Sequence, residues 1–219
     1  MAANASVVRD LRLDARFFAV QEAPIQPFQD TQNEDTMATK SAKSSSGHLA
    51  LNEEALKKAK TSLDDGAVTP HNDGPWVKDI IKLLNDSLAT ELVCVLRYKR
   101  HHYMADGLAS PAIAEEFLVH AQEEQAHADR IATRIVQLGG EPDFNPATLI
   151  ERSHADYNAS NDLKEMIRAN LIAERVAIEA YSQMVDLVGD KDPTTRRLLE
   201  EILNDEQEHA EELKTWLAL

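Results

Sequence analysis

The sequence has one cysteine, only 7 glycines and 8 prolines, and few aromatic residues. A lone cysteine, Cys94, forms neither an internal disulfide nor a cysteine-based zinc site, which excludes a small disulfide-stapled scaffold. No apolar run is long enough to span a bilayer, and the N-terminus lacks the charged and then apolar layout of a secretory signal. These absences predict a protein of a reducing compartment, the cytoplasm, with no membrane partner.

Basic residues are also scarce, because 23 Lys and Arg face 38 Asp and Glu and give a net charge of -15. Residues 1–36 carry -3, residues 37–75 are neutral, and the rest of the chain carries -12. An acidic surface repels DNA phosphates and concentrates metal cations. Binding of DNA would depend on the lysines of residues 37–75, whose charge is cancelled by acidic residues nearby, so DNA is not expected as a partner. These lysines are Lys40, Lys43, Lys57, Lys58 and Lys60.

Residues 1–75 show no sustained hydrophobic period and are rich in small and polar residues. We expect a mostly disordered N-terminal arm there, with a short helix from Glu53 to Ser62. Met37 is an alternative start of the chain. Residues 76–219 are then expected to form one folded domain.

Four segments after residue 75 carry apolar residues at helical spacing, and turn residues mark their limits. A connector at residues 141–160 is long enough to run the length of a helix bundle. The pattern predicts an all-α four-helix bundle, made of two helical hairpins joined by a long crossover. The predicted helices run from Trp76 to Tyr103, from Ser110-Pro111 to Gly139-Gly140, from Asn161 or Asp162 to Gly189, and from Asp192-Pro193 onward.

Charged residues interrupt each of the four apolar stripes. The first and third stripes each contain one glutamate, and the second and fourth each contain a Glu-x-x-His pair, whose spacing puts both side chains on one helix face. The lone glutamate precedes that of the pair by 33 residues in the first half and by 32 in the second, which indicates an internal duplication. The six candidate metal ligands are Glu91, Glu124, His127, Glu174, Glu206 and His209.

Four carboxylates in a dry interior are prohibitive unless cations join them, and two divalent metal ions would balance their charge. The absence of thiolates from the ligand set favours iron or manganese over structural zinc, and therefore redox chemistry. A third Glu-x-x-His copy, Glu151 to His154, lies in the connector with no apolar stripe around it, so we interpret it as a chance match.

Three neighbouring residues have weaker signals. Asp205 and Glu123 each directly precede a ligand glutamate, and we expect them to hydrogen-bond the imidazole from the opposite hairpin. His120 lies one turn before Glu124 and is expected to be a core histidine rather than a ligand.

Residues 76–217 resemble the ferritin-like superfamily, and most of all the bacterioferritins and the bacterioferritin-related, Dps-like mini-ferritins. The resemblance rests on Glu91-Leu92-Val93 and on the segments 124–130 and 201–206. It implies a di-iron centre in which Tyr98, seven residues after Glu91, lies beside the metals and supplies an electron. It also implies bridging roles for Glu124 and Glu206, terminal roles for Glu91 and Glu174, and one imidazole for each iron from His127 and His209.

The resemblance further implies a ferroxidase that oxidises Fe(II) with O₂ or H₂O₂ and stores iron in a homo-oligomeric cage, in iron storage and oxidative-stress defence. Gln125 stands where bacterioferritins have their haem-binding methionine, so no haem is expected. The chain stops at Leu219 without the fifth helix of 24-subunit cages, which favours a 12-subunit shell. Two alternatives stay open, namely a rubrerythrin-like di-iron peroxidase or oxidase without mineral storage, and a Dps-like DNA-protecting shell.

Overall fold

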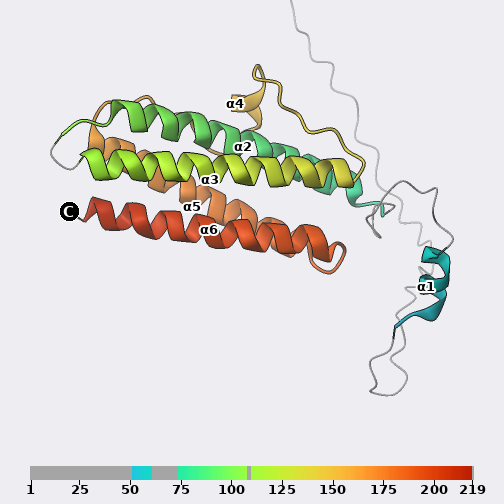
Figure 1. Ribbon diagram of the computed structural model, residues 1–219. Coiled ribbons are helices and arrows are strands. Elements are labelled where there is room, and N and C mark those ends of the chain that lie inside the picture. The colour runs from blue at the N-terminus through green and yellow to red at the C-terminus, as the bar shows by residue number, and fades with distance from the viewer. Residues whose placement is uncertain (1–50, 61–73, 108–109, 219) are drawn as a thin grey trace, which may run out of the picture. The chain divides into compact units, whose positions relative to one another are not determined.

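The computed structural model describes residues 51–60, 74–107 and 110–218. Within these ranges all regular secondary structure is helical, which confirms the predicted all-α class (Figure 1). None of the described helices combines the length and the apolar character needed to cross a bilayer. The long helices are α2 (Val77–Met104), α3 (Ser110–Gln137), α5 (Leu163–Val188) and α6 (Pro193–Leu217), and the short ones are α1 (Glu53–Ala59) and α4 (Leu149–Arg152).

The helix limits follow from local hydrogen bonding. Asp162 caps α5 by accepting from the Glu165 amide at 2.9 Å, and Asp192 caps α6 by accepting from the amides of Thr194 and Thr195. Gly189 ends α5 with a positive φ of 50°, a conformation that costs glycine little. These caps were predicted from the sequence and are confirmed.

The long helices form two hairpins, α2 with α3 and α5 with α6, which meet through α2 with α5 and α3 with α6 (Figure 1). The crossover from α3 to α5 runs along α2 and is tied to it at successive points. The Asn85 side chain hydrogen-bonds to the backbone of Glu141 and Asp143. Further along α2, Thr90 accepts from the amide of His154, and Arg97 donates to the Asp156 carbonyl. The two-hairpin topology with a long crossover is confirmed, whereas helix α4 within the crossover was not predicted.

The apolar interior consists of two main clusters separated by a polar layer. One cluster includes Leu88 and Ile131, and the other includes Phe117 and Leu213. Along every long helix the ligand residues lie between these clusters, so the bundle holds its charges at mid-length with apolar packing on both sides.

The predicted disorder of the N-terminal arm, and the choice between Met1 and Met37 as the start, fall on residues that lie outside the described ranges. Helix α1 occupies the N-terminal part of the short helix expected from Glu53. The division of the chain at residue 75 stays a prediction.

Candidate metal centre

The structure brings all six sequence-predicted ligands together, two from each Glu-x-x-His helix and one from each of the other two. They are buried at mid-bundle, and none is more than 4% exposed. Their ligand atoms form two overlapping groups, in each of which all atoms lie within 4.8 Å of one another. One group is Glu91, Glu124, His127 and Glu206, and the other is Glu124, Glu174, Glu206 and His209.

The two shared glutamates face both imidazoles with different oxygens. His127 Nδ1 lies 3.4 Å from Glu124 Oε2 and 3.3 Å from Glu206 Oε1. His209 Nδ1 lies 3.7 Å from Glu124 Oε1 and 3.6 Å from Glu206 Oε2. This arrangement suits carboxylates that bridge two metal positions.

The other two glutamates each face one imidazole only. Glu91 Oε2 lies 3.6 Å from His127 Nδ1, and Glu174 Oε2 lies 4.0 Å from His209 Nδ1. Each metal position would therefore have one imidazole, one terminal carboxylate and one oxygen from each bridging carboxylate. The bridging and terminal roles of these glutamates stay predictions.

Carboxylates outside the centre orient both imidazoles, as the sequence predicted. His127 Nε2 lies 3.1 Å from Asp205 Oδ2, and His209 Nε2 lies 2.9 Å from Glu123 Oε2. An Nε2–H donated outward leaves the Nδ1 lone pair directed into the centre, which is the tautomer that a metal ligand requires.

Two tyrosines support the terminal glutamates in the same way. Tyr98 donates its hydroxyl proton to Glu174 Oε1, and Tyr181 donates to Glu91 Oε1. Each tyrosine follows the glutamate of its own helix by seven residues and binds the glutamate of the opposite hairpin. Tyr98 was predicted to lie beside the centre. Tyr181 was seen only as part of an apolar stripe, although the internal duplication could have revealed it.

Within the described residues, the buried side-chain nitrogen and oxygen atoms that make no hydrogen bond belong to the six ligands, with His101 Nε2 as the one exception. The unpaired atoms include both oxygens of Glu124 and Glu206 and the Nδ1 atoms of both imidazoles. Since buried polar atoms without partners are costly, this donor set fits a bound cation pair.

The pKa values of several ligand side chains are also shifted in the direction that adds positive charge to the centre. Burial and the neighbouring Glu124 raise the pKa of Glu91, and burial with Glu124 and Glu206 raises that of Glu174. Burial alone would lower the pKa of His209, but hydrogen bonds to carboxylates outweigh it and raise this pKa to about 12. The centre therefore retains protons where metal ions would otherwise balance its charge.

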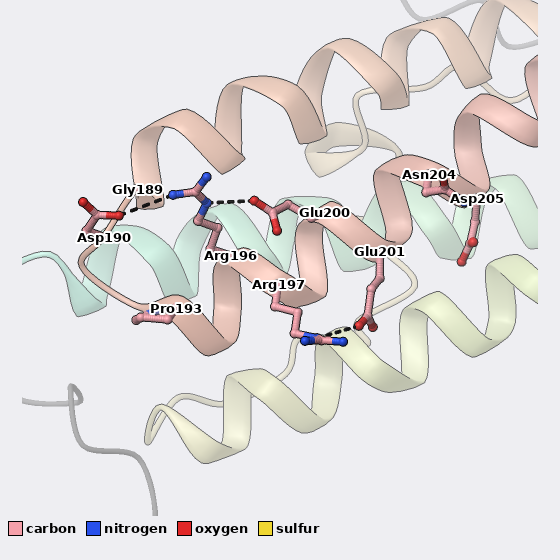
Figure 2. A pocket seen from close by; sticks show the side chains of 9 residues that line it. All are labelled: Gly189, Asp190, Pro193, Arg196, Arg197, Glu200, Glu201, Asn204 and Asp205. Atoms are coloured by element: carbon pink, nitrogen blue, oxygen red, sulfur yellow. Dashed lines mark hydrogen bonds and ion pairs between the residues drawn. The ribbon is translucent and has the colours of Figure 1, made fainter. Parts of the chain in front are cut away.

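The flanks of the centre differ along the seam between α3 and α6. Beyond His127, Arg130 Nη2 lies 2.6 Å from Glu201 Oε2, and Arg197 Nε lies 2.9 Å from Glu201 Oε1. Figure 2 shows Arg197 paired with Glu201 in a pocket along α6 that extends to Asp205. Beyond His209, by contrast, the seam carries Glu and His side chains.

The third Glu-x-x-His copy, Glu151 to His154, lies at the crossover helix α4. Glu151 lies exposed in α4. The backbone amide of His154 donates a hydrogen bond to Thr90 Oγ1 on α2. Neither residue belongs to a candidate metal cluster among the described residues.

Comparison with known proteins agrees with this architecture. The model of the ferritin-like domain family matches residues 81–219, which include all six ligands. The chain belongs to the ferritin-like family. A bacterioferritin of Mycobacterium leprae is 30% identical over 142 residues, which cover 64% of this chain and 85% of that relative.

Two solved ferritin-like structures extend the likeness. A bacterioferritin-related protein of Bacteroides fragilis, described as a dodecameric thioferritin, has a TM-score of 0.63 and 28% identity, over 76% of this chain and 94% of that one. The bacterioferritin of Desulfovibrio desulfuricans, solved with its di-iron site in different catalytic states, has a TM-score of 0.58 and 27% identity, over 65% and 80%. This ferritin-like chain is thus similar to a dodecameric protein and to a di-iron protein.

Proposed function

We propose that this protein is a cytoplasmic ferroxidase, which binds two ferrous ions per subunit, oxidises them with O₂ or H₂O₂, and stores the ferric product in a homo-oligomeric cage. The ligands of the proposed centre are Glu91, Glu124, His127, Glu174, Glu206 and His209. The observation that carries the proposal is the pair of buried glutamates that each present both oxygens, without hydrogen bonds among the described residues, to two imidazoles.

The ligand chemistry supports iron as the substrate. Oxygen ligands with two imidazoles and no thiolate suit Fe(II) and stabilise Fe(III) as charge increases. Two Fe(II) ions supply two electrons, which with two protons convert O₂ to H₂O₂ or convert H₂O₂ to two waters. No haem is part of the proposal.

The protein's own residues would hold and orient the irons. Asp205 and Glu123 fix the imidazole rings through their outer nitrogens. Tyr98 would supply one electron to the oxidant in place of one from Fe(II), with its hydroxyl proton retained on Glu174, to which it is hydrogen-bonded.

The cage is the second part of the proposal. The Bacteroides fragilis protein is a dodecamer and resembles this chain over most of its own length, which supports a 12-subunit shell here. An acidic shell would also concentrate ferrous ions near its openings.

The test is addition of Fe(II) to metal-free protein, with and without O₂, following the ferric absorbance and the iron bound per subunit. We expect rapid oxidation of two irons per subunit and then slower uptake of many more. Glu124→Ala should abolish the rapid phase, whereas Glu151→Ala, the same substitution in the chance Glu-x-x-His copy, should leave it unchanged.

The outcome also separates the alternatives. Oxidation that stops at two irons per subunit would replace storage with a cycling rubrerythrin-like peroxidase or oxidase. A protein without rapid oxidation that retards DNA at low salt would instead support the Dps-like shell.

A further inference from the structure

A fully buried arginine, Arg97 of α2, lies beside the metal centre, and among the described residues it forms no ion pair with a carboxylate. Its Nε donates to Asn170 Oδ1 at 2.7 Å, its Nη1 to the Asp156 carbonyl at 3.1 Å and its Nη2 to Cys94 Sγ at 3.3 Å. Burial raises the pKa of Cys94, so this partner is a thiol. The guanidinium therefore has neutral groups as its hydrogen-bond partners.

Arg97 nevertheless keeps its positive charge. Burial alone would lower its pKa, but Cys94 and Glu174 outweigh burial and raise it. A buried charge is costly unless an opposite charge compensates it. Since Glu174 is also a ligand of the proposed centre, the charge of Arg97 belongs to the electrostatics of that centre.

This charge lies on the His209 side of the centre. The guanidinium carbon of Arg97 is 5.5 Å from the centroid of the Tyr98 ring, and Tyr98 donates its hydroxyl proton to Glu174. Asn170, which accepts from Arg97, precedes Glu174 by one helical turn. Glu174 is the terminal glutamate that faces His209. Tyr98 and Glu174 thus connect the guanidinium to the metal position of His209.

The other half of the internal duplication has no charge at the matching position. By offset from Glu91 and Glu174, the residue equivalent to Arg97 is Ala180, directly before Tyr181. The two metal positions therefore have equivalent ligands and equivalent tyrosines, but only one of the two tyrosines follows a buried cation.

A fixed positive charge repels a bound cation, and the repulsion is strong in a dry interior and falls with distance. A divalent ion is repelled twice as strongly as a proton that competes for the same carboxylates. Arg97 should therefore weaken metal binding overall, and more at the His209 position than at the His127 position.

We propose that Arg97 makes the two positions of the metal centre unequal, so that a divalent ion binds first at His127 and second at His209. Arg97 touches neither metal position and acts as a positioning residue through Tyr98 and Glu174. The inference rests on the metal binding in the proposed function and not on the oxidation step. The His209 position then limits formation of the ferrous pair at low iron concentration.

The first test is calorimetric titration of the metal-free protein with Co²⁺ in the absence of oxidant, which gives a dissociation constant for each step. Arg97→Met removes the charge, and Arg97→Lys keeps it. The control is Arg100→Met, because Arg100 also ties the crossover to α2, donating to the Ser160 carbonyl at 3.2 Å, but is only partly buried.

We expect Arg97→Met to bind the second Co²⁺ about ten-fold more tightly than the wild type, because the repulsion is gone. Arg97→Lys and Arg100→Met should keep the wild-type value. A role of Arg97 in the fold alone would weaken binding when the side chain is removed, so a gain in affinity separates the two roles. Unchanged or weaker binding of the second ion in Arg97→Met would overturn the proposal.

The second test needs only the wild type and shows which position fills first. Anomalous diffraction is measured from crystals with one Co²⁺ per subunit, and we expect the stronger peak at His127 Nδ1. Equal peaks, or a stronger peak at His209 Nδ1, would overturn the order of binding. Absence of Co²⁺ from both positions would overturn this inference together with the proposed function. Ordered binding without oxidation of Fe(II) would support the inference and overturn the ferroxidase proposal alone.

Discussion

The two ends of the α3–α6 seam differ in how their charges are paired around a nearly symmetric centre. On the His209 side the seam has Glu116 and Glu212, and on the His127 side it has Arg130 and Arg134. The ligands, the orienting carboxylates and the tyrosines repeat on both sides, whereas these flanking residues do not. The duplicated hairpins therefore share the candidate ligand set and differ in what surrounds it.

The arginine end is built for stability. Arg134 Nη2 lies 2.7 Å from Asp192 Oδ2, with both side chains nearly fully buried, and Asp192 also caps α6. The acidic end has no such closed ion pair among the described residues, and its carboxylates reach solvent. One end of the seam thus holds the hairpins together, and the other end presents carboxylates to solvent.

The largest expected effect is loss of metal from the centre after substitution of its glutamates. Because Glu124 and Glu206 each face both imidazoles, Glu124→Ala and Glu206→Ala should each lose both central metal ions. Glu91→Ala should lose only one ion, since Glu91 faces His127 alone. Anaerobic dialysis against Co²⁺ measures the counts, and a Glu124→Ala protein that kept one central ion would contradict the bridging role.

The next effect sharpens the contrast between the two ends. Asp192→Ala should destabilise the fold by about 3–5 kcal/mol, as expected for a broken buried ion pair, and leave the central metal count unchanged. Urea unfolding measures the loss. Asp190→Ala, which removes an exposed aspartate three residues earlier than Pro193, is the control and should change stability by less than about 1 kcal/mol.

The stabilisation by Asp192 should also depend on pH. Burial raises the pKa of Asp192, but hydrogen bonds from Thr195 and Arg134 outweigh it and lower this pKa in the folded protein. Its contribution is therefore present above the pKa of the unfolded chain and is lost as the pH falls through the lower, folded value. If the wild type and Asp192→Ala lost stability equally on acidification, this account of the arginine end would be wrong.

A smaller effect tests whether the orienting carboxylates are equivalent. Asp205→Asn and Glu123→Gln should each weaken metal binding by about 10–100-fold, because both carboxylates fix the ring of a ligand histidine. Calorimetric titration with Co²⁺ gives the affinities. Loss in only one variant would show that the two sides differ at the centre and not only at the flanks.

The sequence was sufficient for those parts of the molecule whose signals are local or repeated. Asp162 and Asp192 cap helices within three residues of themselves, and the ligands follow from a spacing of three residues that occurs twice on apolar stripes. The contact of Asp205 with His127 was also predictable, because an acidic residue directly precedes the glutamate of each Glu-x-x-His pair.

The parts that were missed depend on long-range pairing. His120 meets Glu212 across 92 residues, and nothing near either residue in the sequence indicates the contact. His120 was expected to be a core histidine, and its burial is confirmed, but the carboxylates beside it could not be foreseen. Helix α4 was missed because the crossover is held by long-range bonds to α2, from Asn85 to the Glu141 carbonyl and from Arg152 to the Asn85 carbonyl, which a four-residue segment does not indicate.

The smallest expected effect separates the two tyrosines. Tyr98→Phe and Tyr181→Phe should each cost the metal-free protein about 1 kcal/mol through a lost hydrogen bond to a terminal glutamate. Among the described residues, an imidazole bonds to the Tyr98 oxygen and none to that of Tyr181, so only Tyr98→Phe should remove a tyrosyl radical signal after Fe(II) and H₂O₂ are mixed. Electron paramagnetic resonance on both variants checks this, and a signal that persists without Tyr98 would exclude its role.

The most direct test of the central claim is anomalous diffraction from crystals of the protein loaded with Co²⁺ in the absence of oxidant. We expect two strong peaks between the hairpins, one bound to His127 Nδ1 and one to His209 Nδ1, with Glu124 and Glu206 spanning both. A single central peak, or peaks only at sites away from these residues, would contradict the account.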